Sequence, residues 1–98
     1  MKKYAFVLLG AGYDPVRHTA EFTAGSSLTR ICTVRSFEEA ERTVLALQAE
    51  GFGAVELCGA FGPERADRLT QLTGGTMAIG YVTHDPAQDH LFAAFFGD

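Results

Sequence analysis

A glutamate lies inside an apolar segment, residues 54–63, that reads AVELCGAFGP. Side chains alternate along a strand, so Glu56 and Cys58 are expected to point to the same face. A carboxylate in a buried strand is costly unless it is hydrogen-bonded, paired or protonated, and such groups also perform acid–base chemistry. Buried ion pairs place carboxylates in the same way, so we favour a structural partner: a neighbouring loop, Arg17, Arg30 or another subunit.

Cys58 precedes a glycine-rich turn that leads into a predicted helix. A thiol near a helix start acts as a nucleophile when its pKa is lowered, and His84 or His18 would then be the base. An inert thiol is the more ordinary interpretation, because free cysteines are among the most buried residue types. The offset from Asp85 to His90 suits one helical face poorly, so we expect no metal site and no cofactor.

Turns at the predicted carboxyl ends of the strands offer a place for a small ligand. Glycines let a ligand approach the backbone, and the free amides of a helix starting at Gly62 would attract an anion. The first turn lacks the later glycine of a dinucleotide-binding fingerprint, and turn geometry alone explains each glycine equally well. The candidate ligand-binding residues are Gly10, Gly12, Glu56, Cys58, Gly59, Phe61, Gly62 and His84.

The elements that would position these residues alternate between strands and helices. Strands are predicted at residues 4–9, 19–23, 28–34, 52–58 and 76–82, and helices at 37–50, from Pro63 to about residue 73, and after Asp85. The first strand should be buried on both faces, and the third should have one wetter face because it lies at a sheet edge. Ser36 and Glu39 form a capping box at the first helix.

This order predicts an α/β fold in one domain, residues 1–98. Alternating helices and strands give a small, mostly parallel sheet with flanking helices and right-handed crossovers. The fold should resemble half of a flavodoxin-like or Rossmann-like sheet, with an antiparallel edge hairpin. Both two-layer and three-layer arrangements fit the pattern.

Composition excludes several classes of function. The net charge is −4 and the eight Lys and Arg residues are scattered, so no basic patch is available for nucleic acid. No apolar run approaches the roughly 20 residues that span a bilayer, so we expect no membrane partner. Two cysteines and the lack of a signal-peptide pattern indicate a cytoplasmic protein with reduced thiols.

The segment ELCGAFG at residues 56–62 resembles the V-E-L-C-G-x-F-G signature of a family of small bacterial proteins of unknown function. The resemblance extends through the first strand, the segment from Asp14 to His18, the hairpin and the helix after Ser36, and it fades at residues 91–96. It implies a compact α/β fold and a bacterial, cytoplasmic setting. It implies no activity, substrate or catalytic residue.

The sequence leaves three alternative functions. The first is a domain that binds a small polar or anionic ligand at the strand ends, which predicts a pocket lined by Glu56. The second is a small enzyme that uses Glu56, Cys58 and His84 within hydrogen-bond reach of one another. The third is a subunit of a homo-oligomer, which we expect in any case because the core is small. For the phenylalanines of residues 91–96 we slightly favour packing on the chain's own sheet over an interface.

Overall fold

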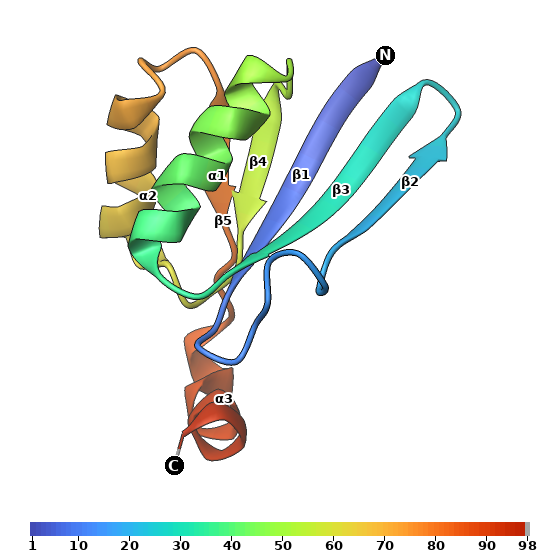
Figure 1. Cartoon of the computed structure of the whole chain (residues 1–98). Helices are drawn as coiled ribbons and strands as arrows, with labels where there is room; N and C mark the ends of the chain where they lie inside the picture. The colour runs from blue at the N-terminus through green and yellow to red at the C-terminus, as the bar shows by residue number, and fades with distance from the viewer. Residues whose placement is uncertain (98) are drawn as a thin grey trace.

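One five-stranded sheet organises the chain in the computed structural model, which describes residues 1–97 (Figure 1). The strand order is β2-β3-β1-β4-β5, in which β2 is antiparallel to β3 and all other neighbours are parallel. This confirms the predicted α/β fold and its antiparallel edge hairpin. The elements are β1 (Lys2–Leu9), β2 (Ala20–Ala24), β3 (Ser27–Val34), α1 (Phe37–Ala49), β4 (Ala54–Leu57), α2 (Gly62–Leu72), β5 (Ala78–Tyr81), the 3₁₀ helix η1 (Pro86–Gln88) and α3 (Asp89–Phe96).

The direction of the crossovers decides which face of the sheet receives helices. The connections β3–α1–β4 and β4–α2–β5 step the same way across the sheet, so right-handed crossovers place both helices on one face. Figure 1 shows α1 and α2 together on that face. The step from β1 to β3 runs the opposite way and would place a helix on the other face. Residues 10–19 and strand β2 make this step instead. The arrangement is therefore two-layered.

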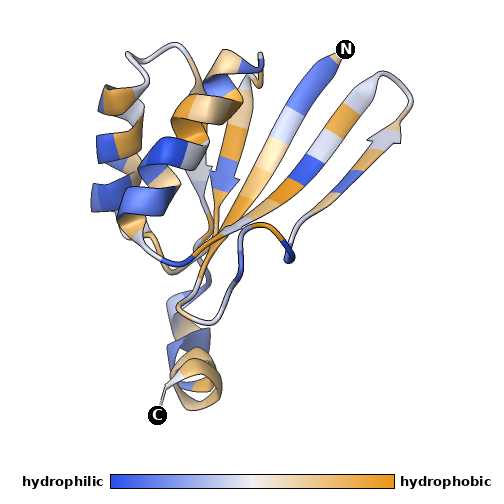
Figure 2. Ribbon diagram, viewed as in Figure 1, coloured by the Kyte–Doolittle hydropathy of each residue, from blue (hydrophilic) through white to orange (hydrophobic). Residues whose placement is uncertain are grey.

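The core lies between the sheet and these two helices, on what we call the covered face. Helix α1 contributes Ala40, Val44 and Leu47, as its periodicity predicts, and α2 contributes Ala66 and Leu69. Figure 2 shows apolar and hydrophilic residues alternating along both helices. The remaining buried apolar residues are Ala5, Val7, Cys32, Val34, Phe52, Val55, Leu57, Phe61 and Met77.

The opposite surface of the sheet, which we call the open face, is only partly shielded from solvent. On β1 the covered-face residues Ala5 and Val7 are 0% exposed, whereas the alternating Tyr4 and Phe6 remain half-buried. The prediction that this strand is buried on both faces is therefore wrong. By strand register the open-face side chains include Tyr4, Phe6, Leu8, Phe22, Thr29, Ile31 and Glu56. Cys58 follows the end of β4 and packs against the core.

Strand β3 is also partly exposed, but for a different reason from the one predicted. It lies between β2 and β1 and is not an edge strand. Residues 27–31 are partly exposed on both faces, whereas Cys32, Thr33 and Val34 are buried, so exposure changes along the strand and not between its faces.

Residues 83–97, which we call the C-terminal arm, extend beyond the carboxyl edge of the sheet (Figure 1). Helix α3 makes its main contacts with η1 and not with the sheet. Phe95 and Phe96 are 78% and 74% exposed. The expectation that the terminal phenylalanines pack on the chain's own sheet is therefore wrong. Within residues 1–97, no helix is both long and apolar enough to cross a membrane.

The core predicts a clear contrast between two leucine substitutions. Leu57 is fully buried, so Leu57→Ala should lower the free energy of unfolding by about 2–5 kcal/mol through lost burial and a new cavity. Leu45 lies on the outer side of α1 and is 41% exposed, so Leu45→Ala should cost below about 1 kcal/mol. Urea unfolding followed by circular dichroism measures both, and equal losses would contradict this assignment of the core.

Candidate functional site

The turns that follow β1, β3, β4 and β5 meet at one edge of the sheet, because these four strands are parallel. Gly10 donates its N–H to the carbonyl of Val34 at 3.0 Å, which holds the first turn to the end of β3. A Cβ atom on Gly10 would lie 3.0 Å from the ring of Tyr13, so a larger residue would push this ring aside. Gly12 has open space around it. The strand ends thus lie side by side as predicted. The contacts of Gly10 with Val34 and Tyr13 are structural.

Glu56 lies on the open face, where β4 pairs it with Phe6 on one side and Gly80 on the other. Its carboxylate rests over Gly80, since a Cβ atom at that glycine would be 2.7 Å from Oε2. Burial, followed by the negative charge of Glu56, raises the pKa of Tyr4. The half-exposed carboxylate thus occupies a notch that Gly80 leaves open among aromatic neighbours.

No side chain or backbone donor among residues 1–97 is hydrogen-bonded to this carboxylate, and no cation pairs with it. Arg30, one predicted partner, lies on the other face of the sheet. It donates to Glu21 at 2.7 Å and to Glu50 at 3.1 Å, and its guanidinium stacks over Phe52. The intramolecular pair between Glu56 and Arg30 is therefore wrong, and a partner from another subunit stays a prediction.

Cys58 has a structural task at the point where β4 ends. Its carbonyl accepts the N–H of Phe61 at 3.1 Å and so closes the turn. Its Sγ accepts the N–H of Leu9 at 3.3 Å, which gives the last amide of β1 a partner where the strand ladder stops. The other cysteine, Cys32, is in the core, and burial raises the pKa of its thiol.

The rest of this turn contributes backbone more than side chains. Phe61 is 4% exposed, so its ring belongs to the core. Gly62 begins α2 with a φ of +75°, a conformation that favours glycine. Gly59 is exposed, and a Cβ there would lie 3.7 Å from the carbonyl oxygen of Val82.

His84 belongs to the C-terminal arm. Its Nε2 lies 2.6 Å from Oδ1 of Asp89, and its ring stacks on Phe92 with the centroids 4.0 Å apart. Within residues 1–97, no hydrogen bond joins Glu56, Cys58 and His84. The structure therefore does not assemble these three groups into the acid–base and nucleophile set that an enzyme would need.

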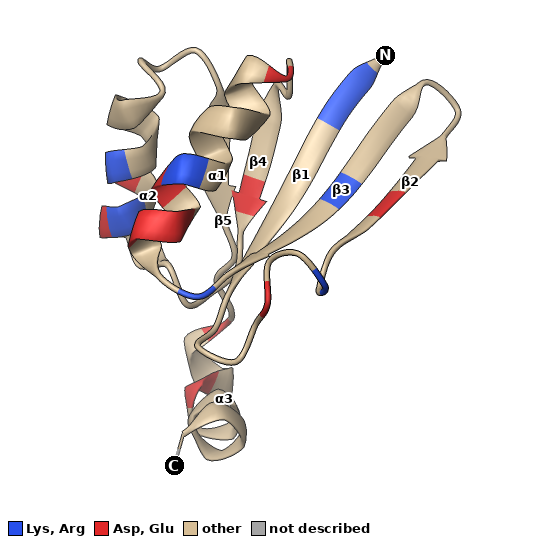
Figure 3. Ribbon diagram, viewed as in Figure 1, with Lys and Arg blue, Asp and Glu red and all other residues tan. Residues whose placement is uncertain are grey.

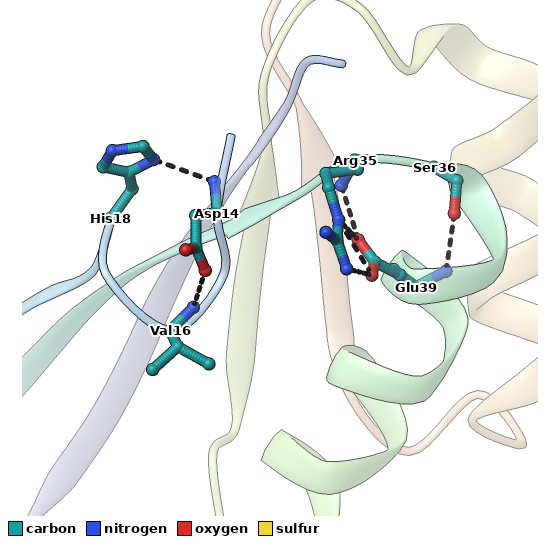
Figure 4. Close-up of polar contacts among 6 residues, drawn as sticks. All are labelled: Asp14, Val16, His18, Arg35, Ser36 and Glu39. Atoms are coloured by element: carbon teal, nitrogen blue, oxygen red, sulfur yellow. Dashed lines mark hydrogen bonds and ion pairs between the residues drawn. The ribbon is translucent and has the colours of Figure 1, made fainter. Parts of the chain in front are cut away.

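Sequence reasoning missed a polar cluster at the ends of β1 and β3 (Figure 4). Arg35 and Glu39 form a bidentate pair with a shortest distance of 2.7 Å, and Glu39 also accepts the backbone N–H of Arg35 at 2.7 Å. Ser36 caps the helix through the N–H of Glu39 as predicted, but the carboxylate reaches Arg35 instead of Ser36. The spacing of four residues between Arg35 and Glu39 was the available signal.

The same region fixes His18. Its Nδ1 accepts the N–H of Asp14 at 2.8 Å, which assigns the ring proton of the neutral form to Nε2. Asp14 in turn accepts the N–H of Val16 at 3.0 Å, so the segment is an Asx turn and not the start of a helix.

Surface hollows lie elsewhere. One of about 230 Å³ lies between α2 and β5 and is lined in part by Pro63, Asp67 and Tyr81. Another, of about 490 Å³, lies beside Glu41 and Arg68. Glu56 lines neither of these hollows, so neither is the predicted ligand pocket around its carboxylate. No cluster of three or more His, Cys, Asp or Glu in residues 1–97 is arranged to hold a metal ion.

The Arg35–Glu39 pair predicts a measurable titration. The hydrogen bonds from Arg35 lower the pKa of Glu39 from 4.5 to about 2, so the stabilisation is present above pH 4.5 and is lost as the pH falls toward 2. Arg35→Gln should raise this pKa part of the way toward 4.5, because the backbone N–H of residue 35 still donates to the carboxylate; NMR titration of the carboxyl carbon measures it. The control Arg42→Gln removes only a weak charge effect and should leave the pKa low. A pKa that stays near 2 in Arg35→Gln would contradict the assignment.

Comparison with known proteins places the chain in one family. No curated protein and no solved structure matches it. A family model described as "Family of unknown function (DUF6506)" matches residues 2–97. The match includes residues 91–96, so the expectation that the resemblance fades there is wrong. The chain belongs to DUF6506, a family of unknown function.

Proposed function

We propose that this chain is a small-molecule-binding domain and that a polar ligand lies on the open face against Glu56. The observation that carries this proposal is the carboxylate itself: it is half-exposed, rests over Gly80 and has no partner among residues 1–97. A strand glycine weakens a sheet, so a glycine that makes room for a side chain suggests a use for that space. A group that binds in the notch would complete the hydrogen bonds of Glu56.

The chemistry of the notch selects among the ligands expected from the sequence. An ionised carboxylate only accepts hydrogen bonds, so the ligand must bring N–H or O–H donors. The negative charge of Glu56 disfavours an anion. Arg35, a cation at the end of β3, is already paired with Glu39. The neighbouring rings of Tyr4 and Phe6 provide apolar contact, and they also favour a cationic ligand. These features support an amine, guanidine, amide or hydroxyl compound over an anionic one.

An enzymatic function has less support. The thiol of Cys58 accepts a backbone hydrogen bond, and His84 pairs with Asp89 in the C-terminal arm. An acid–base reaction needs a second group within reach of Glu56, and no second side chain of residues 1–97 is hydrogen-bonded to it.

Native mass spectrometry of gently purified protein tests the proposal. The wild type should carry a bound small molecule. In Glu56→Gln the bound fraction should fall at least about tenfold, since a hydrogen bond to a charged group contributes about 1.5–3 kcal/mol. Gly80→Ala should have a similar effect, because the new Cβ displaces the carboxylate without removing its charge.

Glu38→Gln provides the matched control. It removes the same charge from an exposed position on α1 and should retain the ligand. A wild type without a bound molecule, or equal occupancy in all four proteins, would contradict the proposal.

A further inference from the structure

We infer that two copies of this chain pair through their open faces, with each copy's C-terminal arm lying on the sheet of the other. The inference does not depend on the ligand proposed above. It rests on two apolar surfaces of the same chain, the arm and the open face, which do not contact each other within the described residues.

The arm has an ordered apolar surface that does not pack on the rest of the chain. Phe92 stacks on His84 and lies near Phe96, whose ring also contacts Phe95 edge-on at 4.9 Å. Local bonds hold this shape, since Asp85 accepts the N–H of Ala87 and begins η1. An isolated helix as short as α3 is unstable in water, so its apolar stripe needs packing from elsewhere.

The open face offers matching chemistry. Phe22 is 54% exposed and pairs with Thr29, two residues from Ile31 on the same strand, and Ile31 in turn pairs with Phe6 on β1. Of the strand residues assigned to this face by register, only Lys2 and Glu56 are charged, whereas α1 and α2 together carry eight of the twenty charged residues (Figure 3). Copies with a net charge of −4 repel each other, so this nearly neutral face is where they can approach.

The dimensions agree with a stable pair. Helix α3, with eight residues, is about 12 Å long, and a five-stranded sheet is roughly 20 Å wide. At about 200 Å² per aromatic side chain, the exposed parts of Leu91, Phe92, Phe95 and Phe96 amount to roughly 450 Å² per arm. Covered sheet of similar area brings the total to roughly 900 Å² per copy, and stable interfaces bury about 800 Å² per partner.

A second copy explains both surfaces at once. A different protein would cover the open face or the arm, whereas in a twofold pair the arm of each copy covers the open face of the other. The arm is placed on β2 and β3, away from Glu56 and its neighbours on β1, because an apolar helix on an unpaired carboxylate would be costly. The ligand notch and the contact between copies therefore use different parts of the open face.

The experiment measures mass in solution by light scattering after gel filtration. The full chain should elute as a pair of 10.5 kDa chains. Phe95→Glu in the arm and Ile31→Glu on the open face should each weaken association at least about a hundredfold and give monomers. Leu45→Glu, which adds the same charge on the outer side of α1, should remain a dimer. Far-UV circular dichroism of each variant establishes that it is folded.

Mixing the two defective chains distinguishes exchange from other modes of pairing. The Ile31→Glu chain keeps a normal arm and the Phe95→Glu chain keeps a normal open face, so one of the two contacts is intact in the mixture. Heterodimers should form at least about tenfold more tightly than either variant pairs with itself. Contacts of arm with arm, or of face with face, predict no such rescue and would overturn the inference.

A monomeric wild type would also overturn it. Hydrogen exchange would then separate the other occupants of the open face. A protected arm would indicate that it folds onto its own sheet, and an unprotected arm would indicate a different protein partner. Because none of these variants changes Glu56 or Gly80, failure here leaves the ligand test unaffected.

Discussion

The parallel strands β1 and β3 are connected through another strand, β2, and not through a helix. The rest of the structure depends on this connection. Two parallel neighbours need a crossover, which is usually a helix packed on the sheet. Here residues 10–19 and β2 return the chain within the plane of the sheet. Two hydroxyl groups hold this connection against β3: Thr33 donates to the carbonyl of His18, and Thr19 donates to the carbonyl of Ile31. The two helical crossovers share the other face. One face therefore has a core, and the opposite face has none.

The bare face accounts for the position of the unusual residues. A carboxylate is tolerated at Glu56 because this side of β4 remains partly hydrated, whereas Val55 and Leu57 on the other side are fully buried. The same argument explains why Tyr4 and Phe6 are half-exposed in a central strand. The arm is the second consequence: the chain leaves β5 at the sheet's carboxyl edge, and its aromatic residues do not reach the sheet beneath.

Local pattern predicted most of the elements, and topology explains most of the errors. Apolar runs located the strands, the Ser36 cap located α1, and Gly25 after residues 19–23 located the hairpin. Burial of the first strand on both faces was predicted wrongly, because a continuous apolar run does not reveal that its crossover lacks a helix. Alternation predicted that Glu56 and Cys58 share a face, but β4 ends at Leu57 and Cys58 packs against the core. The notch at Gly80 depends on strand pairing that one sequence does not specify.

Hydroxyl-radical footprinting over a hundredfold range of protein concentration tests the central claim, that the bare face is covered by another copy. Labelling of Phe22, Ile31 and Phe95 should fall together as concentration rises, while buried Phe61 stays unlabelled throughout. Labelling of the sheet and the arm that does not change with concentration would contradict this claim.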